Sequence, residues 1–371
     1  MNSKTFRRLC AGLLVGAGLA STLSSCGAKP ITVMSYKDSE ITANQYSYWL
    51  STYKTEFLNY YEDAADEDAF WDDTLTVDGV EMTVDQYATD LINNRIKYTL
   101  IGIQLFREYG LKIDADTTQA IDDDINEKID FYGSRADMNT ALSAIGLNAD
   151  MLKDVYIAEE KLVSVYDHLY GEGGIEQLSE AEIDDYYESM YSRIKYIVVY
   201  TDADYVYDEE GNIQYDENGY MMTRELTDEE KSEKQAKLEE IMLCVNAGDD
   251  FLDIQKEYNE VDMSYYENGF YVSPNELGTY GFTMITAVQE MQEGEIRMIE
   301  DTHSTYVVQK LPLLERKDFE KCDEAQMENL TAYAVQQKYE EKFSALAEEV
   351  TLAEEELSKF SVRTAALNSY F

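Results

Sequence analysis

RIKYIVVYT, residues 193–201, is the stretch that decides the fold, because the hydrophobic pattern changes there from helical to strand-like. Every second residue of this stretch is apolar or aromatic, which is the period of a strand with one buried face. These residues are Ile194, Tyr196, Val198 and Tyr200. The segments before it carry helical patterns, so the chain is predicted to be α+β, with its sheet in the middle of the sequence.

Helical patterns run through the residues before this strand. Thr42 with Gln45 and Thr83 with Gln86 form capping boxes, the pairs that satisfy the first free N–H groups of a helix. Aromatic and apolar residues follow the first box at helical spacing, which predicts a helix with one buried aromatic face. They are Tyr46, Trp49, Leu50, Tyr53, Phe57 and Tyr60. Further helices are expected at 83–109, 116–132, 137–145 and 149–170, so the first third is predicted to be helical apart from a strand-like piece at 31–35.

The residues after the strand combine sheet and helix. An acidic insertion at 202–225 is expected to form a small hairpin, because glycine turns flank Ile213. Helices are predicted at 227–247, 254–258 and 287–291, and strands at 269–272 and 305–311. These elements predict a compact α+β domain at 191–313. The last helix, at 318–347, has an amphipathic pattern and is expected to dock on the amino-terminal helices, which makes the helical domain discontinuous.

The amino terminus has the pattern of a bacterial lipoprotein signal. Basic residues are followed by an apolar run at 9–23 that is too short to span a bilayer, and then by Leu-Ser-Ser-Cys at 23–26. Residues 1–25 are therefore expected to be removed, which leaves Cys26 as a lipid-modified first residue that anchors the chain outside a membrane. The alternative is an ordinary secretory signal followed by a chance cysteine.

The charge of the chain limits its partners. With 75 acidic and 30 basic residues, its formal net charge is −45, which repels nucleic acids and anionic lipid headgroups. Cationic or unfolded polypeptides are favoured instead, although an acid excess also serves solubility alone. His168, His303, Cys244 and Cys322 have no metal-ligand spacing, so neither a metal nor a cofactor is expected. Whether the two cysteines form a disulfide, and whether the acidic insertion binds calcium, stay open.

Several stretches together resemble the extracytoplasmic foldases of the PrsA and SurA type. RIKYIVVYT is similar to the first strand of their parvulin, or PpiC-type, peptidyl-prolyl isomerase domain. Three later stretches of this chain resemble later elements of that domain: AGDDFLDIQKEYNE at 247–260 resembles its helix-to-helix segment, AVQEMQEGEI at 287–296 its short helix and turn, and STYVVQKL at 304–311 its closing strand. The SurA-type chaperone domain of these proteins resembles ITANQYSYWL at 41–50 and EYGLKIDADTTQAID at 108–122. The resemblance implies an all-α chaperone domain at 26–190 and 314–371, with an inserted isomerase-like domain of about four antiparallel strands at 191–313.

The residues expected in the proline-binding pocket depart from the family pattern. The two histidines on the floor of the parvulin pocket correspond to Tyr196 and Tyr306, and the Met and Phe of its wall correspond to about Tyr280 and Met284. His303 is out of register with Tyr306, so it is interpreted as an exposed turn residue. The resemblance therefore implies a degenerate catalytic pocket. It gives the peptide-binding residues as Tyr196, Val261, Phe270, Met284 and Tyr306, with Asp262 as an alternative to Val261.

These observations favour a membrane-anchored folding factor that binds unfolded secreted polypeptides outside the cytoplasm. The first alternative is an active peptidyl-prolyl isomerase, because isomerisation breaks no covalent bond and a dry pocket with tyrosine hydroxyls can favour the twisted amide. A solute-binding lipoprotein is a weaker alternative, because its lobes need alternating strands and helices, and the amino-terminal part offers hardly any strand. The identity of the clients and the formation of a homodimer stay open.

Overall fold

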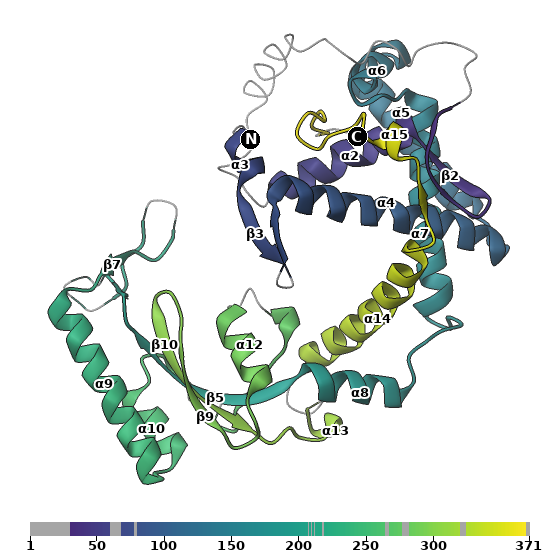
Figure 1. Cartoon of the computed structure of the whole chain (residues 1–371). Coiled ribbons are helices and arrows are strands. Elements are labelled where there is room, and N and C mark those ends of the chain that lie inside the picture. The colour runs from purple at the N-terminus through teal and green to yellow at the C-terminus, as the bar shows by residue number, and fades with distance from the viewer. Residues whose placement is uncertain are drawn as a thin grey trace. The chain divides into compact units, whose positions relative to one another are not determined.

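The computed structural model describes residues 30–59, 68–77, 80–206, 208, 210, 212–216, 219–263, 267–276, 282–319 and 324–368 (Figure 1). The expected signal with Cys26, and also Tyr60, Tyr280 and Cys322, lie outside these residues. The chain divides into two compact units: unit 1 comprises Met1–Gln177 and Gln336–Phe371, and unit 2 comprises Leu178–Val335. Within the described ranges, none of the helices combines the length and hydropathy that a membrane span requires.

Unit 1 is built mainly from helices whose first residues follow local capping rules. Its helices are α2 (Ala43–Asn59), α3 (Asp68–Asp72), α4 (Val84–Glu108), α5 (Ala115–Tyr132), α6 (Arg135–Leu142), α7 (Ala149–Tyr170) and α15 (Glu354–Leu357), with a 3-10 turn at Ser143–Ile145. Both predicted capping boxes are confirmed. Thr83 and Gln86 bond each other's backbone N–H groups at the start of α4, and Thr42 and Gln45 do the same at the start of α2.

The helices α4 and α7 pack at a very short distance from each other. A Cβ atom placed on Gly102 of α4 would lie 2.9 Å from the Cα of Leu162 on α7. Contacts of this kind force neighbouring atoms to move, so the side chain of any other residue would separate the two helices. Gly102 is therefore required by packing and not by backbone conformation.

Unit 1 also contains two small antiparallel sheets, so the prediction of an all-α domain is wrong. β1 (Thr32–Tyr36) lies between β11 (Thr351–Leu352) and β2 (Ser39–Thr42), and β3 (Thr74–Val77) pairs with β4 (Val80–Thr83). The strand-like piece predicted at 31–35 corresponds to β1. The other strands have two to four residues, too few to show a period of two, and β11 pairs with a strand from the opposite end of the sequence, which no local pattern reveals.

The last described residues are held against α2 by polar contacts. The buried Nζ of Lys54 donates to the carbonyl oxygens of Arg363 and Ala365, each at 2.8 Å. The backbone N–H of Asn368 donates to Thr55 Oγ1 at 2.8 Å. These bonds satisfy an ammonium group that would be costly to bury without partners. The carboxyl-terminal segment is thus part of the packing of unit 1.

The helix α14 (Glu324–Ala347) begins in unit 2 and ends in unit 1. In unit 1, the rings of Tyr339 and Phe343 lie 5.9 and 5.5 Å from the ring of Tyr98 on α4. Tyr339 also contacts Tyr166 of α7, with ring centroids 5.4 Å apart. Unit 1 is therefore formed from two separate parts of the chain, and unit 2 is inserted between them.

Unit 2 is organised around a four-stranded antiparallel sheet with the strand order β8-β5-β10-β9. The strands are β5 (Ser192–Tyr200), β8 (Phe270–Val272), β9 (Ile296–Glu300) and β10 (Ser304–Leu311). The strands predicted from RIKYIVVYT and at 305–311 are confirmed, and they pair with each other from Arg193 with Leu311 to Tyr200 with Ser304. β9 is not among the predicted strands. It begins at Ile296, directly after the turn at Gly294.

Helices cover both faces of this sheet (Figure 1). α9 (Asp228–Ala247) and α10 (Phe251–Tyr258) pack on one face, against Ile197, Val199 and Val307. α12 (Phe282–Glu290) packs on the other face through Met284 and Ile285, so it begins earlier than the helix predicted at 287–291, since burial on the sheet stabilises its first turn. The remaining helices are α8 (Glu180–Met190), α13 (Arg316–Phe319) and a 3-10 turn at Pro274–Glu276.

The acidic insertion folds as two short hairpins on a common base. β6 (Ala203–Tyr205) pairs with β7 (Thr223–Glu225) at the base. Beyond this pair, the backbones of Val206, Gln214 and Met222 are linked by a ring of three hydrogen bonds, 2.8 to 2.9 Å long. The carboxylates of Asp208 and Asp216 each accept a backbone N–H from four residues later, which closes the two turns.

Candidate functional site

Tyr196, Tyr306, Phe270 and Met284 lie together on one face of the unit 2 sheet. The ring of Tyr196 stands edge-to-face against both Phe270 and Tyr306, with centroids 5.5 Å apart in each pair. Met284 of α12 is fully buried, Phe270 is 7% exposed, and the two tyrosines are half-buried against them. The structure thus brings together four of the predicted site residues, which come from β5, β10, β8 and α12.

The three rings form part of the hydrophobic core of unit 2. Edge-to-face aromatic pairs contribute about 0.5–1.5 kcal/mol each beyond the burial of their surface. Tyr196 makes two such contacts, one on each side of its strand. These side chains therefore pack against one another instead of standing apart as the walls of an open pocket.

Tyrosines continue along the same face toward the acidic insertion. Tyr200 follows Tyr196 on β5 at the spacing of four residues that keeps side chains on one face, and its ring lies 5.9 Å from that of Tyr205. Burial raises the pKa of Tyr200, and Tyr205, Tyr306 and Tyr196 raise it further. The hydroxyl of Tyr200 therefore stays protonated at neutral pH and acts as a hydrogen-bonding group and not as a base.

The two histidines of the chain lie outside this face. His303 is exposed in the turn between β9 and β10, with its Nδ1 3.4 Å from Asp202 Oδ2. His168 lies on α7 in unit 1, where its ring packs on Tyr109 with centroids 5.0 Å apart. In the part of the chain that the structure describes, no group of three His, Cys, Asp or Glu side chains is arranged to hold a metal ion.

Val261 and Asp262 line a separate cavity of about 360 Å³ beside α10. Met263 is the link to the ring cluster, because it lines this cavity and also packs against the core that contains Met284. The other lining residues are Leu252, Gln255, Lys256, Asn259, Glu260 and Glu267. The resemblance to parvulins therefore assigns Val261 or Asp262 to the proline pocket, but in the structure both residues line this separate cavity and lie apart from the cluster of Tyr196 and Tyr306.

The free edge of β5 is closed by side chains and not by a strand. β8 pairs only with the first three residues of β5. Further along, Gln255 Nε2 donates to the carbonyl oxygen of Tyr196 at 2.7 Å, and the N–H of Val198 donates to Asn259 Oδ1 at 2.8 Å. Unpaired strand edges recruit other chains, so these contacts, called here the sealed edge, protect the sheet.

Glu260 completes the sealed edge. Its Oε2 accepts the N–H of Tyr200 at 2.8 Å, its own N–H donates to the carbonyl oxygen of Val198 at 3.2 Å, and its Oε1 accepts from Lys234 and Lys237 at 2.7 and 2.8 Å. Burial alone would raise the pKa of Glu260, but the hydrogen bonds from the two lysines and from Tyr200 outweigh it, so the pKa is lowered.

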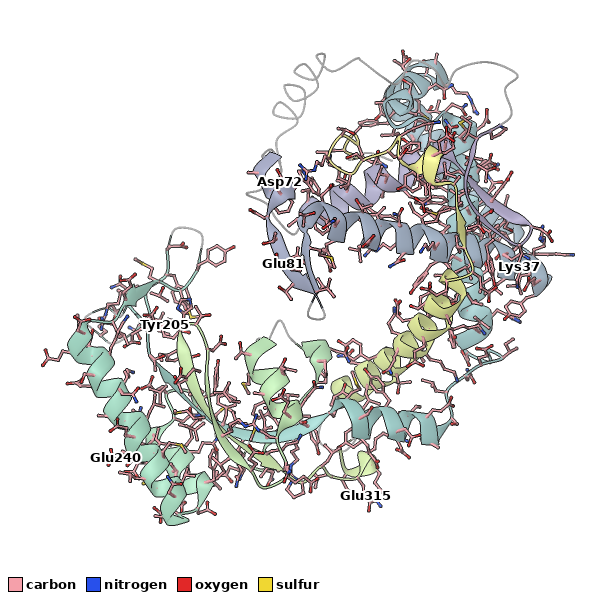
Figure 2. All side chains as sticks on the ribbon, in the orientation of Figure 1. Lys37, Asp72, Glu81, Tyr205, Glu240 and Glu315 are labelled. Atoms are coloured by element: carbon pink, nitrogen blue, oxygen red, sulfur yellow. The ribbon has the colours of Figure 1, made fainter. Side chains whose placement is uncertain are left out.

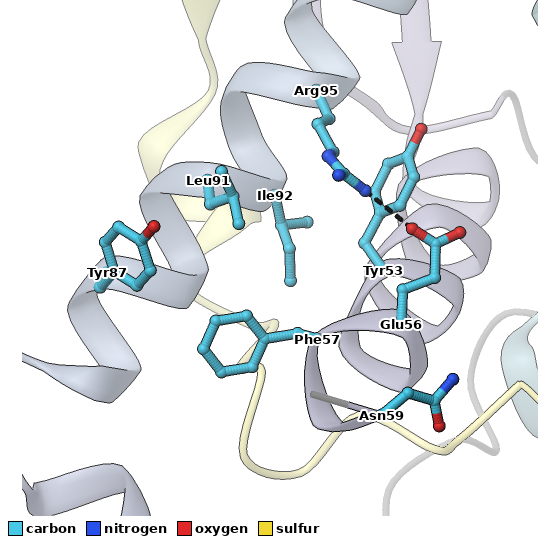
Figure 3. Close-up of a pocket in the computed structure, with 8 residues that line it drawn as sticks. All are labelled: Tyr53, Glu56, Phe57, Asn59, Tyr87, Leu91, Ile92 and Arg95. Atoms are coloured by element: carbon cyan, nitrogen blue, oxygen red, sulfur yellow. Dashed lines mark hydrogen bonds and ion pairs between the residues drawn. The ribbon is translucent and has the colours of Figure 1, made fainter. Parts of the chain in front are cut away.

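A second candidate site is a cavity of about 600 Å³ between α2 and α4 in unit 1 (Figure 3). Its wall is largely aromatic and aliphatic, with one charged pair at the side. The lining residues are Tyr53, Glu56, Phe57, Asn59, Tyr87, Leu91, Ile92 and Arg95. Phe57 and Ile92 are buried, whereas Tyr53, Tyr87 and Leu91 are half-buried and remain in contact with solvent.

The charges around this cavity compensate one another. Arg95 Nη1 lies 2.7 Å from Glu56 Oε2, and the guanidinium stands 5.0 Å from the centroid of the Tyr53 ring, in the position of a cation–π contact. Burial, with a smaller contribution from Glu159 that Arg95 opposes, raises the pKa of Tyr53 to about 12, so its hydroxyl is neutral. The cavity therefore presents a neutral and mostly apolar wall.

Sequence reasoning did not predict this cavity. The helical spacing of apolar residues in the sequence places Tyr53 and Phe57 on a buried aromatic face. That spacing is the same whether the side chains fill a core or line a cavity, so it cannot distinguish the two. The stacked pair of Phe57 with Trp71, with centroids 6.2 Å apart, shows that part of the face is ordinary core. The only signal in the sequence is the high tyrosine content, 31 of 371 residues.

Glu159 of α7 is a half-buried carboxylate close to α2. Its Oε1 accepts a hydrogen bond from Trp49 Nε1 at 2.9 Å. Burial raises the pKa of Glu159, the bond from Trp49 opposes this shift, and Glu56 adds to it. Burial also raises the pKa values of Tyr48 and Tyr156, with a contribution from Glu159. A carboxyl group in this setting is protonated more easily than one in water.

No family model and no curated protein matches the chain. Solved structures do match it. The chain is similar to PrsA foldases. PrsA from Bacillus subtilis is 16% identical, and the match covers 78% of this chain and 93% of that chain, with a TM-score of 0.23.

Two further PrsA structures give similar values. The peptidylprolyl isomerase PrsA from Bacillus cereus is 16% identical over 78% of this chain and 92% of that chain, with a TM-score of 0.29. The foldase protein PrsA from Streptococcus pneumoniae is 16% identical over 77% of this chain and 92% of that chain, with a TM-score of 0.25. PrsA is the type of protein that the sequence motifs resemble, but at TM-scores below 0.5 these superpositions by themselves assign neither a fold nor an activity to this chain.

Proposed function

We propose that this chain is an extracytoplasmic folding factor that binds apolar segments of unfolded secreted polypeptides. The observation that carries the proposal is the cavity between α2 and α4. Its volume of about 600 Å³ lies within the roughly 300–1,000 Å³ that is typical of binding pockets. A neutral wall accepts apolar side chains of many sequences, which is what a factor with varied clients needs.

The tyrosines of the cavity suit this role. Tyr53 and Tyr87 offer large contact areas at the solvent-exposed side, and tyrosine tolerates both water and apolar partners. Phe57 and Ile92 form a fixed apolar floor, because both are buried among neighbouring side chains. An extended client would insert one or two apolar side chains and leave its backbone in water.

In this proposal, residues 191–313, which lie within unit 2, form a parvulin-like domain with little or no catalytic activity. Tyr196 and Tyr306 occupy the positions that parvulins fill with histidine, according to the sequence resemblance. Their contacts with each other and with Phe270 support a packing role for both rings. The proposed chaperone domain comprises residues 26–190 and 314–371, and the parvulin-like domain comprises residues 191–313.

The proposal is tested by the aggregation of an unfolded client. Purified chain at several-fold molar excess is expected to suppress light scattering by a reduced, denatured client protein. Leu91→Trp adds bulk to one wall and narrows the cavity, so this variant should weaken the suppression, and because Leu91 is half-buried beside the cavity the added ring has space and the melting temperature should stay close to that of the wild type. Val163→Trp on α7 is the matched control, because Val163 is 50% exposed and does not line the cavity.

Two outcomes would contradict the proposal. If the wild-type chain does not suppress aggregation, the proposed folding-factor function is wrong. If wild type and Leu91→Trp suppress aggregation equally and have equal melting temperatures, the cavity is not the site that binds clients.

A lipid anchor at Cys26 is part of the proposal. Cells that express the chain and grow on a labelled fatty acid should incorporate label into the wild type and not into Cys26→Ser. The wild type should fractionate with membranes, while the serine variant should be released or retained as precursor. Incorporation of label into the serine variant would contradict this assignment.

Peptidyl-prolyl isomerisation is the second candidate function, because Tyr196, Tyr306, Phe270 and Met284 converge on one face. A protease-coupled assay with a short proline peptide measures it. Tyr196→Phe combined with Tyr306→Phe keeps the rings and removes the hydroxyl groups. A wild-type rate that disappears in this double variant would establish catalysis by the hydroxyls, and a rate equal to the uncatalysed one would exclude it.

A further inference from the structure

The acidic insertion of unit 2 exposes large apolar side chains that the proposed function does not use. Tyr215, Tyr220, Met221 and Met222 are 59%, 72%, 51% and 40% exposed. They lie on the second of the two short hairpins that follow β6, whose last residue, Tyr205, is labelled in Figure 2. These four residues are called here the insertion patch. Four large apolar side chains exposed on one hairpin indicate an interaction site more often than single exposed residues do.

The backbone gives the insertion patch a defined shape. Tyr215 and Met221 are directly opposed in an antiparallel bridge, so their side chains project from one side of the second hairpin. Tyr220 and Met222 flank Met221 along the chain, so their side chains project from the other side of the hairpin, and the insertion patch covers both of its sides. The three hydrogen bonds that link Val206, Gln214 and Met222 join both hairpins to the base. Asp216 accepts the N–H of Tyr220 at 2.9 Å and closes the turn between the two halves of the patch. The side chains are thus presented on a hydrogen-bonded support.

The charge around the patch selects the partner. Residues 202–225 contain eight acidic side chains and one basic side chain, Arg224. Arg224 is paired with Glu230 at 2.7 Å, so the field of the insertion is negative. An anionic lipid surface, a nucleic acid and a second copy of this chain, which carries a formal charge of −45, are all repelled. A basic polypeptide is attracted.

We infer that the insertion patch binds a polypeptide segment in which basic and apolar residues are mixed. Methionine side chains adapt to partners of different shape, and tyrosine provides contact area that tolerates water. The carboxylates of Asp208 and Asp216 stand at the turns of the hairpins and supply the charge that matches lysine and arginine. This site lies in unit 2 and selects by charge, whereas the cavity in unit 1 is neutral.

Fluorescence anisotropy tests the inference with two labelled synthetic peptides. One peptide alternates leucine with lysine, and the other alternates leucine with glutamate. The full chain is expected to bind the lysine peptide, with an affinity that falls as salt is added, and not the glutamate peptide. The triple variant Tyr215→Ser, Tyr220→Ser, Met221→Ser should weaken binding of the lysine peptide by about tenfold or more.

The control separates the patch from the general charge of the chain. Ile175→Ser combined with Leu243→Ser removes two other apolar side chains, which are 59% and 70% exposed, and leaves every charge in place. This double variant should bind the lysine peptide like the wild type. Circular dichroism and the melting temperature establish that both variants are folded, which surface substitutions of this kind preserve.

Three results would overturn the inference: no binding of the lysine peptide by the wild-type chain, equal binding by the triple variant, or equal binding of the glutamate peptide. These outcomes are distinct from failure of the proposed function. Leu91→Trp should keep its affinity for the lysine peptide while its aggregation suppression weakens, and the triple serine variant should leave the cavity in unit 1 unchanged.

Discussion

Single residues decide what each candidate site can do. On the unit 2 face, Tyr196 and Tyr306 supply rings and hydroxyl groups, but a tyrosine hydroxyl does not gain and lose a proton near neutral pH as histidine does. In unit 1, Arg95 and Glu56 neutralise each other at 2.7 Å, and the remaining wall of the cavity is uncharged and mostly apolar. One face is therefore suited to packing and weak polar contacts, and the other to apolar side chains.

Replacing Glu159 by Gln is expected to stabilise unit 1 at neutral pH. Burial raises the pKa of Glu159 above its ordinary value of 4.5, so the folded state binds the proton more tightly than the unfolded state. Stability is therefore lost as the pH rises from about 4.5 through the raised pKa. Gln keeps an acceptor for Trp49 Nε1 and removes the charge, so the variant should melt about 2–4 °C higher at pH 7, and little higher at pH 4.

Thermal denaturation followed by circular dichroism at a series of pH values measures this difference. Asp154→Asn on the exposed side of α7 is the control, and its melting temperature should follow that of the wild type. A difference between Glu159→Gln and wild type that does not change with pH would show that burial of this charge is not the cause.

At the scale of elements, the sealed edge explains how the second half of β5 can lie beside a helix with no strand on that side. Gln255, Asn259 and Glu260 replace the hydrogen bonds that a neighbouring strand would make. An open edge would be a hazard for a protein that meets unfolded chains, because such chains add to exposed strands. The loop after α10 therefore protects unit 2 from the partners that the chain is proposed to bind.

Glu260→Ala is expected to destabilise unit 2 by about 2–4 kcal/mol, because it removes the acceptor for Tyr200 N–H and the partner of two lysines. Differential scanning calorimetry gives the change, and light scattering should show faster aggregation on heating. Glu257→Ala, at an exposed position of α10, should change neither.

The pH dependence of the same variant adds a second measurement. The lowered pKa of Glu260 means that its stabilising contribution is present above about pH 4.5 and is lost as the pH falls through the folded-state value. The difference between wild type and Glu260→Ala should therefore shrink in acid. A difference that stays constant down to low pH would contradict the role of the ionised carboxylate.

The elements that sequence reasoning predicted well are those with local signals. The boxes of Thr42 with Gln45 and of Thr83 with Gln86 mark the starts of α2 and α4, and the alternation in RIKYIVVYT marks β5. β11 was not predictable, because its two residues become a strand only by pairing with β1. The cavity in unit 1 depends on how closely α2 and α4 approach, and periodicity contains no information about that distance.

The four side chains that converge on the unit 2 face also lie on elements with local sequence signals. Tyr196, Phe270, Met284 and Tyr306 lie on elements whose order and spacing follow the family pattern, so their convergence could be expected. Val261 follows the end of α10, where the chain turns back to form the sealed edge. That turn depends on the contacts of Asn259 and Glu260 with β5, which only the folded structure reveals.

At the scale of the whole molecule, the chain consists of two units that have separate cores. The core of unit 1 includes Leu100, and that of unit 2 includes Ile197, both fully buried. Acidic side chains occur throughout, for example at Asp72 and Glu81 in unit 1 and at Glu240 and Glu315 in unit 2 (Figure 2). Each unit is therefore stabilised by its own core, whereas the negative charge is shared by the full chain.

Calorimetry of the full chain is expected to resolve two unfolding transitions, one for each unit. Leu100→Ala should lower one of them and Ile197→Ala the other, each by about 2–5 kcal/mol, because each substitution leaves a cavity in one core. If either substitution lowers both transitions equally, the two units unfold together as one cooperative body, and the division into units does not correspond to separate unfolding free energies.

Added salt is expected to raise both melting temperatures. The net charge of −45 destabilises the compact state by self-repulsion, and salt screens repulsion between exposed charges with a Debye length of about 10 Å at 0.1 M. Sodium chloride series at constant pH measure this effect. Melting temperatures that fall with salt would show that the ion pairs of the surface outweigh the repulsion.

The contacts of the carboxyl-terminal segment with α2 and β1 limit the order in which the units can be completed. Every residue of unit 2 precedes residues 351–368 in the chain, so this unit has all of its residues while the earlier helices still lack their final partners. A chain truncated before residue 351 would therefore contain a complete unit 2 and an incomplete unit 1. The first α-helices of the protein are therefore among the last parts of it to become native.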